Sequence, residues 1–409
     1  MSLEAKFYRF DGYPESDSCW SLSTGPDGKI YAAACCEMSA GKSVKVVRYN
    51  EEKDSLDYLF DVAQAVNDPP DSGRATQCKI HYSFAPSRKT GIMYCASHLS
   101  GPPKGWKYFS PWESWHDKKH AFRGAALVAY DTRGDRIAWY DTLIPKEGCR
   151  CLALDDERDM LYAISYPRDH FIAYSLKDRS RRDLGRIGSV NSQGIFVDRR
   201  HRVWTTSDDG RFVRYDPDRD RLEESPYVMP YPRFQTGWHS VIYDVASWDD
   251  SVFYYTTWNT APHLYRLFTE EGNFGRVEDL GAATQDRDTT IPFSMFVDHA
   301  GGLVFDRDGQ LYFVHSRWKN DRDQLHGEDR QFDAEGVVVK VDPATLRREE
   351  VLILRRPDGI AQYCSRAARD RHGDLFFANV GRIPVGFFRV AMPNRTAGDE
   401  ALLPLRSWG

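Results

Sequence analysis

Four side chains that can exchange protons or hold a carboxylate lie between residues 81 and 166: His81, His98, Arg150 and Tyr166. The guanidinium fork of arginine suits a carboxylate. Histidine and tyrosine can act as base and acid when their neighbours shift their pKa values. Donors around a carboxylate also stabilise the enolate-like charge that forms when the adjacent carbon loses its proton. This set predicts β-elimination, whereas glycoside hydrolysis usually needs two facing carboxylates, and these positions hold no acid pair.

A repeated phrase indicates how the chain could bring these residues together. A polar turn with Asp or Gly is followed by a short aromatic or β-branched strand about seven times. The spacing of the copies ranges from 42 residues (Tyr162 to Trp204) to 68 residues (Tyr94 to Tyr162). A loose period of this size in an all-strand pattern predicts an all-β fold, a seven-bladed β-propeller in one domain over residues 1–409. The aromatic markers of the copies are Tyr31, Tyr94, Tyr162, Trp204, Tyr254, Tyr312 and Phe376.

The second copy predicts the strands of one blade most clearly. Its inner strand is expected at 79–84 and its second strand at 91–98, followed by strands at 125–131 and 136–140. The last copy lacks a fourth strand, and the alternating residues 5–10 could supply it. Pairing of the N- and C-terminal strands would then close the ring and remove its exposed edges.

In such a ring, the start of each inner strand and the end of the strand beside it lie at the same face, because the two strands are antiparallel. His81 and His98 then come from blade 2, and Arg150 and Tyr166 from blade 3. A lone histidine is usually structural, and polar residues on the axis can simply contact channel water. The concentration of four such residues on two adjacent blades favours a functional site.

An aromatic insertion at 99–124 is expected beside these two blades, and long loops inside compact domains are often functional. Tryptophan rings can stack on the apolar faces of sugars. Arg168 is an alternative to Arg150 for neutralising a carboxylate. The residues predicted to bind substrate are Lys79, Trp106, Trp112, Trp115 and Arg168.

A second group of polar residues is expected on the opposite blades. His239, His299 and Cys364 are inner-rim positions, with Cys19 next around the ring. Neutral imidazole and thiolate are good ligands of Zn²⁺ or another divalent metal, which would be structural if its coordination is closed. Ordinary channel-lining polar residues explain the pattern equally well. No organic cofactor is expected, because no Gly-rich phosphate motif is present.

Composition narrows the classes of partner. The net charge of −5 over 409 residues argues against nucleic acid, which needs a basic surface. No apolar run reaches the length of about 18 residues that suggests a membrane span. The expected partner is an acidic oligosaccharide or polysaccharide. The protein would be cytoplasmic if Met1 is the native start, and secreted or periplasmic if a signal peptide has been removed.

Two segments carry a family resemblance. The stretch 77–84, with His81, followed by 91–98, with His98, resembles the paired-histidine region of seven-bladed propeller polysaccharide lyases, which include the ulvan lyases and the rhamnose–glucuronate lyases. The strand 161–167, with Tyr166, is similar to the strand that follows in that group. The architecture covers most of the chain, and the specific matches lie within about 79–98 and 149–170.

The resemblance implies cleavage of a uronic-acid-containing glycan by β-elimination, which leaves an unsaturated sugar. It implies that His81 and His98 act at the uronate together with Tyr166 and Arg150. In the family, the tyrosine is on the inner strand and the arginine at the end of the next, and here that order is exchanged. Some members resemble metalloproteins, which supports His239, His299 and Cys364 as ligands. The alternatives are a carbohydrate- or protein-binding propeller without activity and a metal-dependent lactonase-like hydrolase.

Overall fold

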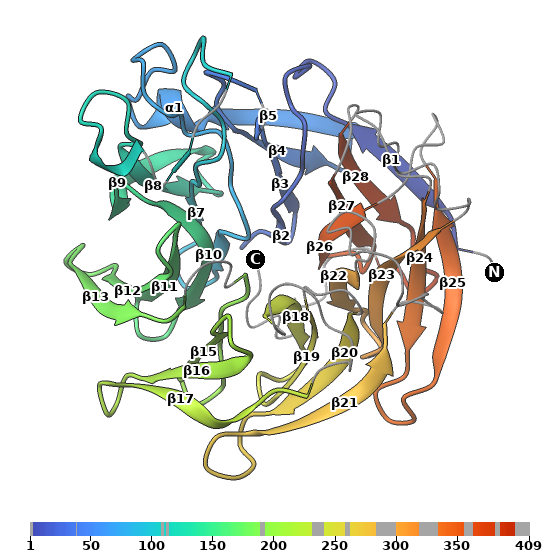
Figure 1. Ribbon diagram of the computed structural model, residues 1–409. Helices are drawn as coiled ribbons and strands as arrows, with labels where there is room; N and C mark the ends of the chain where they lie inside the picture. Colours follow the sequence, from blue (N-terminus) through green and yellow to red (C-terminus); the bar gives the residue numbers. More distant parts are fainter. Residues whose placement is uncertain are drawn as a thin grey trace.

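The chain forms seven four-stranded antiparallel sheets arranged as blades around one axis, as the computed structural model shows (Figure 1). The prediction of an all-β, seven-bladed β-propeller is therefore confirmed. The described residues are 3–37, 39–107, 110–111, 114–188, 193–230, 241–257, 262–283, 300–318, 334–355, 363–380 and 385–396.

Each blade runs from an inner strand at the axis to an outer strand at the rim. Blade 1 consists of β2 (Leu22–Thr24), β3 (Ile30–Ala34), β4 (Lys45–Asn50) and β5 (Ser55–Asp61), and blade 2 of β6 (Phe84–Ser87), β7 (Ile92–Ala96), β8 (Gly124–Asp131) and β9 (Arg136–Pro145). Blade 3 consists of β10 (Gly148–Asp155), β11 (Met160–Tyr166), β12 (His170–Ser175) and β13 (Arg181–Arg186), and blade 4 of β14 (Phe196–Val197), β15 (Val203–Thr206), β16 (Arg211–Asp216) and β17 (Arg221–Val228).

The remaining blades follow the same order. Blade 5 consists of β18 (Ile242–Ser247), β19 (Val252–Thr257), β20 (His263–Phe268) and β21 (Arg276–Ala282), and blade 6 of β22 (Ala300–Phe305), β23 (Leu311–Trp318), β24 (Ala334–Val341) and β25 (Arg348–Leu354). Blade 7 consists of β26 (Tyr363–Arg369), β27 (Leu375–Val380), β28 (Gly386–Val390) and β1 (Ala5–Arg9). In the described ranges, the helical elements are α1 (Val62–Ala65) and a 3₁₀ turn at Ser114–His116. Among the described residues, no helix has the length and apolar character needed to cross a membrane.

The first and last described strands share blade 7, as predicted. Strand β1 pairs with β28 in antiparallel register, with Phe7 opposite Phe388 and Tyr8 opposite Phe387. The Phe7 and Phe388 rings lie 4.9 Å apart, and Tyr8 stacks on Phe387 at 5.6 Å. The first and last strands therefore close the ring by hydrogen bonds and by aromatic packing.

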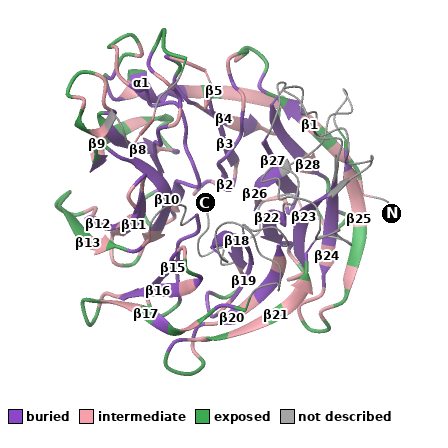
Figure 2. Cartoon of the chain, viewed as in Figure 1, coloured by how far each residue is buried: buried purple, intermediate pink, exposed green. Residues whose placement is uncertain are grey.

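Burial decreases from the axis to the rim (Figure 2). The first seven residues of β8 are buried, because neighbouring strands and blades cover both of its faces. The outer strand β9 instead alternates between exposed and partly buried positions over its first half, which is typical of a strand with one face in solvent. The inner strands are therefore held firmly and can fix the side chains near the axis.

The inner strand of blade 2 differs from its prediction at 79–84, because β6 begins only at Phe84. Tyr82 has a φ of 44°, in the left-handed region that interrupts an extended strand and is unusual for a bulky residue. Upstream of it, Lys79 and His98 form a single isolated bridge. The residues 79–83 are thus an irregular lead into the blade rather than a strand.

Ring closure predicts a specific effect of Gly386→Ala. A Cβ at this position would overlap the carbonyl oxygen of Tyr8, so β1 and β28 would have to separate. We expect the free energy of unfolding to fall by about 1–3 kcal/mol, measured by chemical denaturation. Gly188→Ala is the control, since the nearest atoms to its Cβ belong to the carboxylates of Asp169 and Asp208, with oxygens at 3.1 and 3.3 Å. Equal stability of the two variants would contradict this account of closure.

Candidate functional site

The structure brings His81, His98, Arg150 and Tyr166 into one cluster at one face of blades 2 and 3. The ring centroids of His81 and His98 are 5.3 Å apart, and those of His98 and Tyr166 are 4.6 Å apart. The guanidinium carbon of Arg150 lies 5.1 Å from the centre of the Tyr166 ring. Arg150 comes from β10 and Tyr166 ends β11, so adjacent strands of blade 3 supply both. Their proximity is a structural result, and their chemical roles stay predictions.

Hydrogen-bond partners assign the protons on the two imidazoles. His81 Nδ1 lies 2.9 Å from the carbonyl oxygen of Arg150, and a carbonyl can only accept, so Nδ1 carries the proton. An Arg150 Nη1–H points at His98 Nε2 at 3.4 Å, and arginine can only donate, so Nε2 of His98 is the acceptor. The basic lone pair of His81 is therefore on Nε2, and no described residue donates a hydrogen bond to that atom.

Both imidazoles are neutral at neutral pH. His81 and His98 are only 2% and 1% exposed, and burial is the main reason that the pKa of each lies well below its usual value. The positive charges of Lys79 and Arg150 lower both pKa values further. A histidine kept neutral in this way can accept a proton.

A buried cation from the lead into blade 2 and its carboxylate partner from blade 1 complete the cluster. Lys79, which is 2% exposed, forms an ion pair with Glu37, with Nζ and Oε1 2.7 Å apart. The same ammonium lies 4.2 Å above the Trp20 ring. Burial lowers the pKa of Lys79, and the charge of Glu37 opposes this effect. The predicted substrate-binding residue Lys79 is therefore engaged inside the protein, where it supplies positive charge.

Trp20 and Glu37 were missed by the sequence analysis. Trp20 stacks on His81 with ring centroids 5.0 Å apart and donates its indole N–H to Glu37 at 2.5 Å. Each follows an inner-rim position of blade 1, since Trp20 comes after Cys19 and Glu37 after Cys36. The rule used for blades 2 and 3 selects the start of the inner strand and the end of the strand beside it. In blade 1, including the next residue along the chain at each of these two positions would have identified both Trp20 and Glu37.

Arg168 is held by a carboxylate of its own. Its Nε donates to Glu147 Oε1 at 2.6 Å, and its guanidinium lies 4.1 Å from the Trp115 ring centre. Ser165 also donates to Glu147, whose side chain is buried. Glu147 therefore balances the charge of Arg168, whose guanidinium packs on Trp115. Arg150 is the better candidate for binding a substrate carboxylate.

The structure describes one of the two remaining predicted tryptophans, Trp106. Trp106 is 40% exposed and packs on His120, with ring centroids 4.8 Å apart. Trp112 lies outside the described residues. An exposed aromatic ring such as Trp106 is compatible with sugar stacking, so its predicted role stays a prediction.

The predicted metal ligands are tested only at Cys364, because His239 and His299 lie outside the described residues. Cys364 is 2% exposed and packs in an apolar cluster with Val304, Val338 and Phe377, and burial raises the pKa of its thiol. Within the described ranges, no three His, Cys, Asp or Glu side chains gather in a way that could hold a metal ion. A metal bound by the predicted trio stays a prediction, which elemental analysis of the purified protein tests.

Comparison with known proteins shows the fold. A streptogramin B lyase matches with a TM-score of 0.59 at 10% identity, over 96% of this chain and 98% of its own. A catalytically inactive virginiamycin B lyase from Staphylococcus aureus, solved with quinupristin, matches with a TM-score of 0.57 at 9% identity, over 95% of this chain and 99% of its own. The WD40 repeats of RRP9 match with a TM-score of 0.58 at 10% identity, over 95% of this chain and 98% of their own. No family model and no curated protein matches this chain. The neighbours are propellers with different functions, so they establish architecture alone.

The depressed pKa of His81 predicts an acid-sensitive fold. Below the ordinary histidine pKa of about 6.5, the unfolded chain takes up a proton that the folded chain refuses, so stability falls as the pH falls. His81→Asn removes this proton uptake and can still donate to the Arg150 carbonyl. Between about pH 7.5 and about pH 5.5, we expect the wild type to lose about 1.4 kcal/mol more than the variant in chemical denaturation. The same loss in both proteins would show that His81 titrates normally when folded.

Proposed function

We propose that this protein is a lyase that cleaves a uronic-acid-containing glycan by β-elimination at the cluster of His81, His98, Arg150 and Tyr166. The observation that carries the proposal is the state of His81. Its imidazole is buried and neutral, and its Nδ1–H is fixed on the Arg150 carbonyl, so its basic Nε2 is left for a substrate proton. A guanidinium and a tyrosine lie within the same cluster.

The charge of the cluster favours an anionic substrate. With both histidines neutral, the cluster contains the two cations Lys79 and Arg150, of which Lys79 is paired with Glu37. A uronate carboxylate would add an acceptor for the guanidinium of Arg150. Its bidentate contact with the fork of Arg150 would also stabilise the negative charge that builds up as the neighbouring carbon loses its proton.

The proposed reaction balances without a further reactant. Nε2 of His81 takes the proton from the carbon next to the carboxylate, and that electron pair forms a double bond to the next ring carbon. The bond from this second carbon to the glycosidic oxygen breaks, and the oxygen takes a proton from the Tyr166 hydroxyl. His98 accepts a hydrogen bond from Arg150 and orients the guanidinium. His81 and Tyr166 return to their starting states by exchanging a proton with each other or with water.

The comparisons support the proposal only at the level of the fold. Two of the matched propellers are lyases by name, so this architecture is compatible with elimination chemistry. At about one identical residue in ten, those proteins say nothing about the substrate of this chain. The uronate is therefore argued from the cluster itself and from the resemblance of residues 77–98 to polysaccharide lyases.

An absorbance assay tests the proposal, because elimination creates a conjugated double bond that absorbs in the ultraviolet. The substrates are ulvan, rhamnose–glucuronate-capped arabinogalactan side chains, pectic fragments and glycosaminoglycans. We expect absorbance to rise with one of them. His81→Asn should lower kcat by about 10²–10⁴-fold, because the asparagine amide can still donate to the Arg150 carbonyl but has no basic nitrogen in place of Nε2.

Two controls separate catalysis from binding and from unfolding. His81→Asn should bind the substrate with nearly unchanged affinity in calorimetry and should match wild-type thermal stability at neutral pH. Binding without any rise in absorbance, in both proteins and with added divalent metal, would replace the lyase with a carbohydrate-binding propeller. Full activity of the variant would remove His81 from the mechanism.

The role of Arg150 is tested by Arg150→Lys, which keeps the charge and loses the fork. We expect kcat/KM to fall by about 10²–10³-fold, because bidentate binding of the carboxylate is lost where negative charge develops. Arg168→Lys is the matched control, since Arg168 belongs to the neighbouring group with Glu147 and Trp115. A larger loss of kcat/KM in Arg168→Lys than in Arg150→Lys would show that Arg168, and not Arg150, binds the substrate carboxylate.

A further inference from the structure

A groove lies between blades 2 and 3 at the face of the propeller that carries the candidate site. The end of β9, the turn before β10, the start of β12, the strand β13 and the 3₁₀ turn at Ser114–His116 enclose it. Its volume is about 330 Å³, within the range of about 300–1,000 Å³ that is typical of ligand pockets. Among its lining residues are Trp115, Ile144, Lys146, Arg168, Ile172 and Arg181.

The groove adjoins the cluster that contains His98 and Tyr166. Its lining residue Glu147 precedes Gly148, which pairs with Tyr166 between β10 and β11. A Cβ on Gly148 would lie 3.1 Å from the Cα of His98, so the backbone beside the groove touches the cluster. Arg168 follows Tyr166 by two residues, which spans at most about 7 Å. A glycan whose uronate occupies the cluster can therefore extend into the groove.

The floor of the groove is apolar. Leu143 and Ile144 of β9 and Ile172 of β12 line it, are at most 7% exposed and belong to the hydrophobic core between blades 2 and 3. Pro145 lies beside them and is exposed. A sugar ring has an apolar face of C–H groups and hydroxyl groups on its edge, so it suits an apolar floor with polar groups at the rim.

Trp115 and Arg168 form one wall of the groove. The guanidinium carbon of Arg168 lies 4.1 Å from the centre of the Trp115 ring, and the ion pair with Glu147 holds the guanidinium in place. Trp115 is partly exposed, so part of its ring is open to a ligand. Indole and guanidinium groups both pack on flat partners, which makes this wall a preformed surface for a ring.

The charges of the groove favour an acidic chain. Four of its charged or titratable residues are paired with one another, Arg168 with Glu147 and His170 with Asp183. Lys146 and Arg181 are exposed lining residues, and among the described carboxylates none forms an ion pair with either. They place positive charge at the rim, which attracts an anionic ligand.

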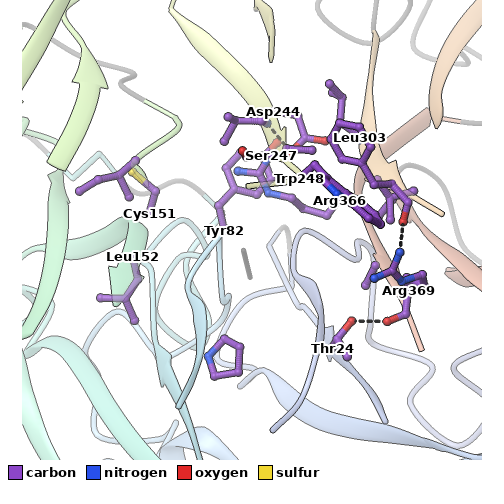
Figure 3. A pocket seen from close by; sticks show the side chains of 18 of the residues that line it. Thr24, Tyr82, Cys151, Leu152, Asp244, Ser247, Trp248, Leu303, Arg366 and Arg369 are labelled. Carbon is purple, nitrogen blue, oxygen red and sulfur yellow. Dashed lines mark hydrogen bonds and ion pairs between the residues drawn. The ribbon is translucent and has the colours of Figure 1, made fainter. Parts of the chain in front are cut away.

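The cavity between the inner strands near the axis has a different character (Figure 3). Its volume is about 80 Å³, far below that of the groove. Its charged side chains bond within the protein, since Arg366 forms an ion pair with Asp244 and Arg369 donates to the carbonyl oxygen of Phe305 at 3.0 Å. The groove between blades 2 and 3 is therefore the better place for a sugar ring.

We propose, on the basis of the proposed function, that this groove binds a further sugar ring of the same acidic glycan, outward from the uronate at the cluster. The ring packs on the apolar floor and on the wall of Trp115 and Arg168, and Lys146 and Arg181 attract the acidic groups of the chain. The substrate is then recognised as a chain rather than as a single uronate. Binding in the groove also helps to hold the uronate in position for reaction.

Calorimetry in the His81→Asn background tests the groove apart from cleavage. The probes are uronate-containing tetrasaccharides from pectin, glycosaminoglycans, ulvan and arabinogalactan side chains, with galacturonate and glucuronate monosaccharides as references. We expect one tetrasaccharide to bind at least about tenfold more tightly than its monosaccharide, because it also buries the apolar floor. Adding Trp115→Ala should weaken tetrasaccharide binding by about tenfold and leave monosaccharide binding unchanged.

Trp139→Ala is the matched control. Trp139 lies on β9 and packs with an arginine in the same way, since the guanidinium carbon of Arg179 is 4.5 Å from its ring centre. It does not line the groove, so this variant should bind the tetrasaccharide as tightly as its parent. Arg181→Glu changes an exposed position and serves as a second test if Trp115→Ala does not fold. It should weaken tetrasaccharide binding by about two- to fivefold.

The outcomes for the groove and for the lyase are distinguishable. The groove is overturned if no tetrasaccharide binds more tightly than its monosaccharide, or if Trp115→Ala and Trp139→Ala bind the tetrasaccharide equally well. A rise in absorbance together with either result would leave the lyase in place without the groove. Tetrasaccharide binding that depends on Trp115, without any rise in absorbance, would support the groove and replace the lyase with a glycan-binding propeller.

Discussion

The pairing of β1 with β28 is the constraint on which the candidate site depends. It joins the first and last described strands in blade 7 and turns seven separate sheets into a closed ring with one axis. Once the ring is closed, residues as distant in sequence as Trp20 and Tyr166 lie in one chain of contacts that passes through His81 and His98. The irregular segment before β6 is held from both sides, by blades 1 and 3.

Electrostatics set the protonation state of the candidate site. Burial is the main reason that His81 and His98 are neutral, and the charges of Lys79 and Arg150 add to it. Glu37 forms an ion pair with Lys79. Burial of a cation is costly unless an anion accompanies it, which favours an acidic substrate at this site.

The architecture could be predicted from sequence because each blade repeats a local signal, a turn followed by an aromatic strand. The pairing of 5–10 with the last strand followed from alternation and from a missing fourth strand. The inner strand of blade 2 was placed too early, because no local pattern announces the left-handed backbone of Tyr82. Trp20 and Glu37 were missed for a related reason. Their roles depend on contacts with Lys79 and His81 across blades, and the protonation of each imidazole depends on partners that only the folded chain supplies.

The central claim is that the cluster breaks a carbon–oxygen bond by elimination, and the mass of the product tests it most directly. The protein would be incubated with a glucuronate-containing oligosaccharide in water enriched in heavy oxygen. Elimination predicts a new non-reducing end that is lighter than the hydrolysis product by one water, with no heavy oxygen incorporated during bond cleavage. Saturated products that carry one heavy oxygen for each bond cleaved would contradict the account and indicate a hydrolase.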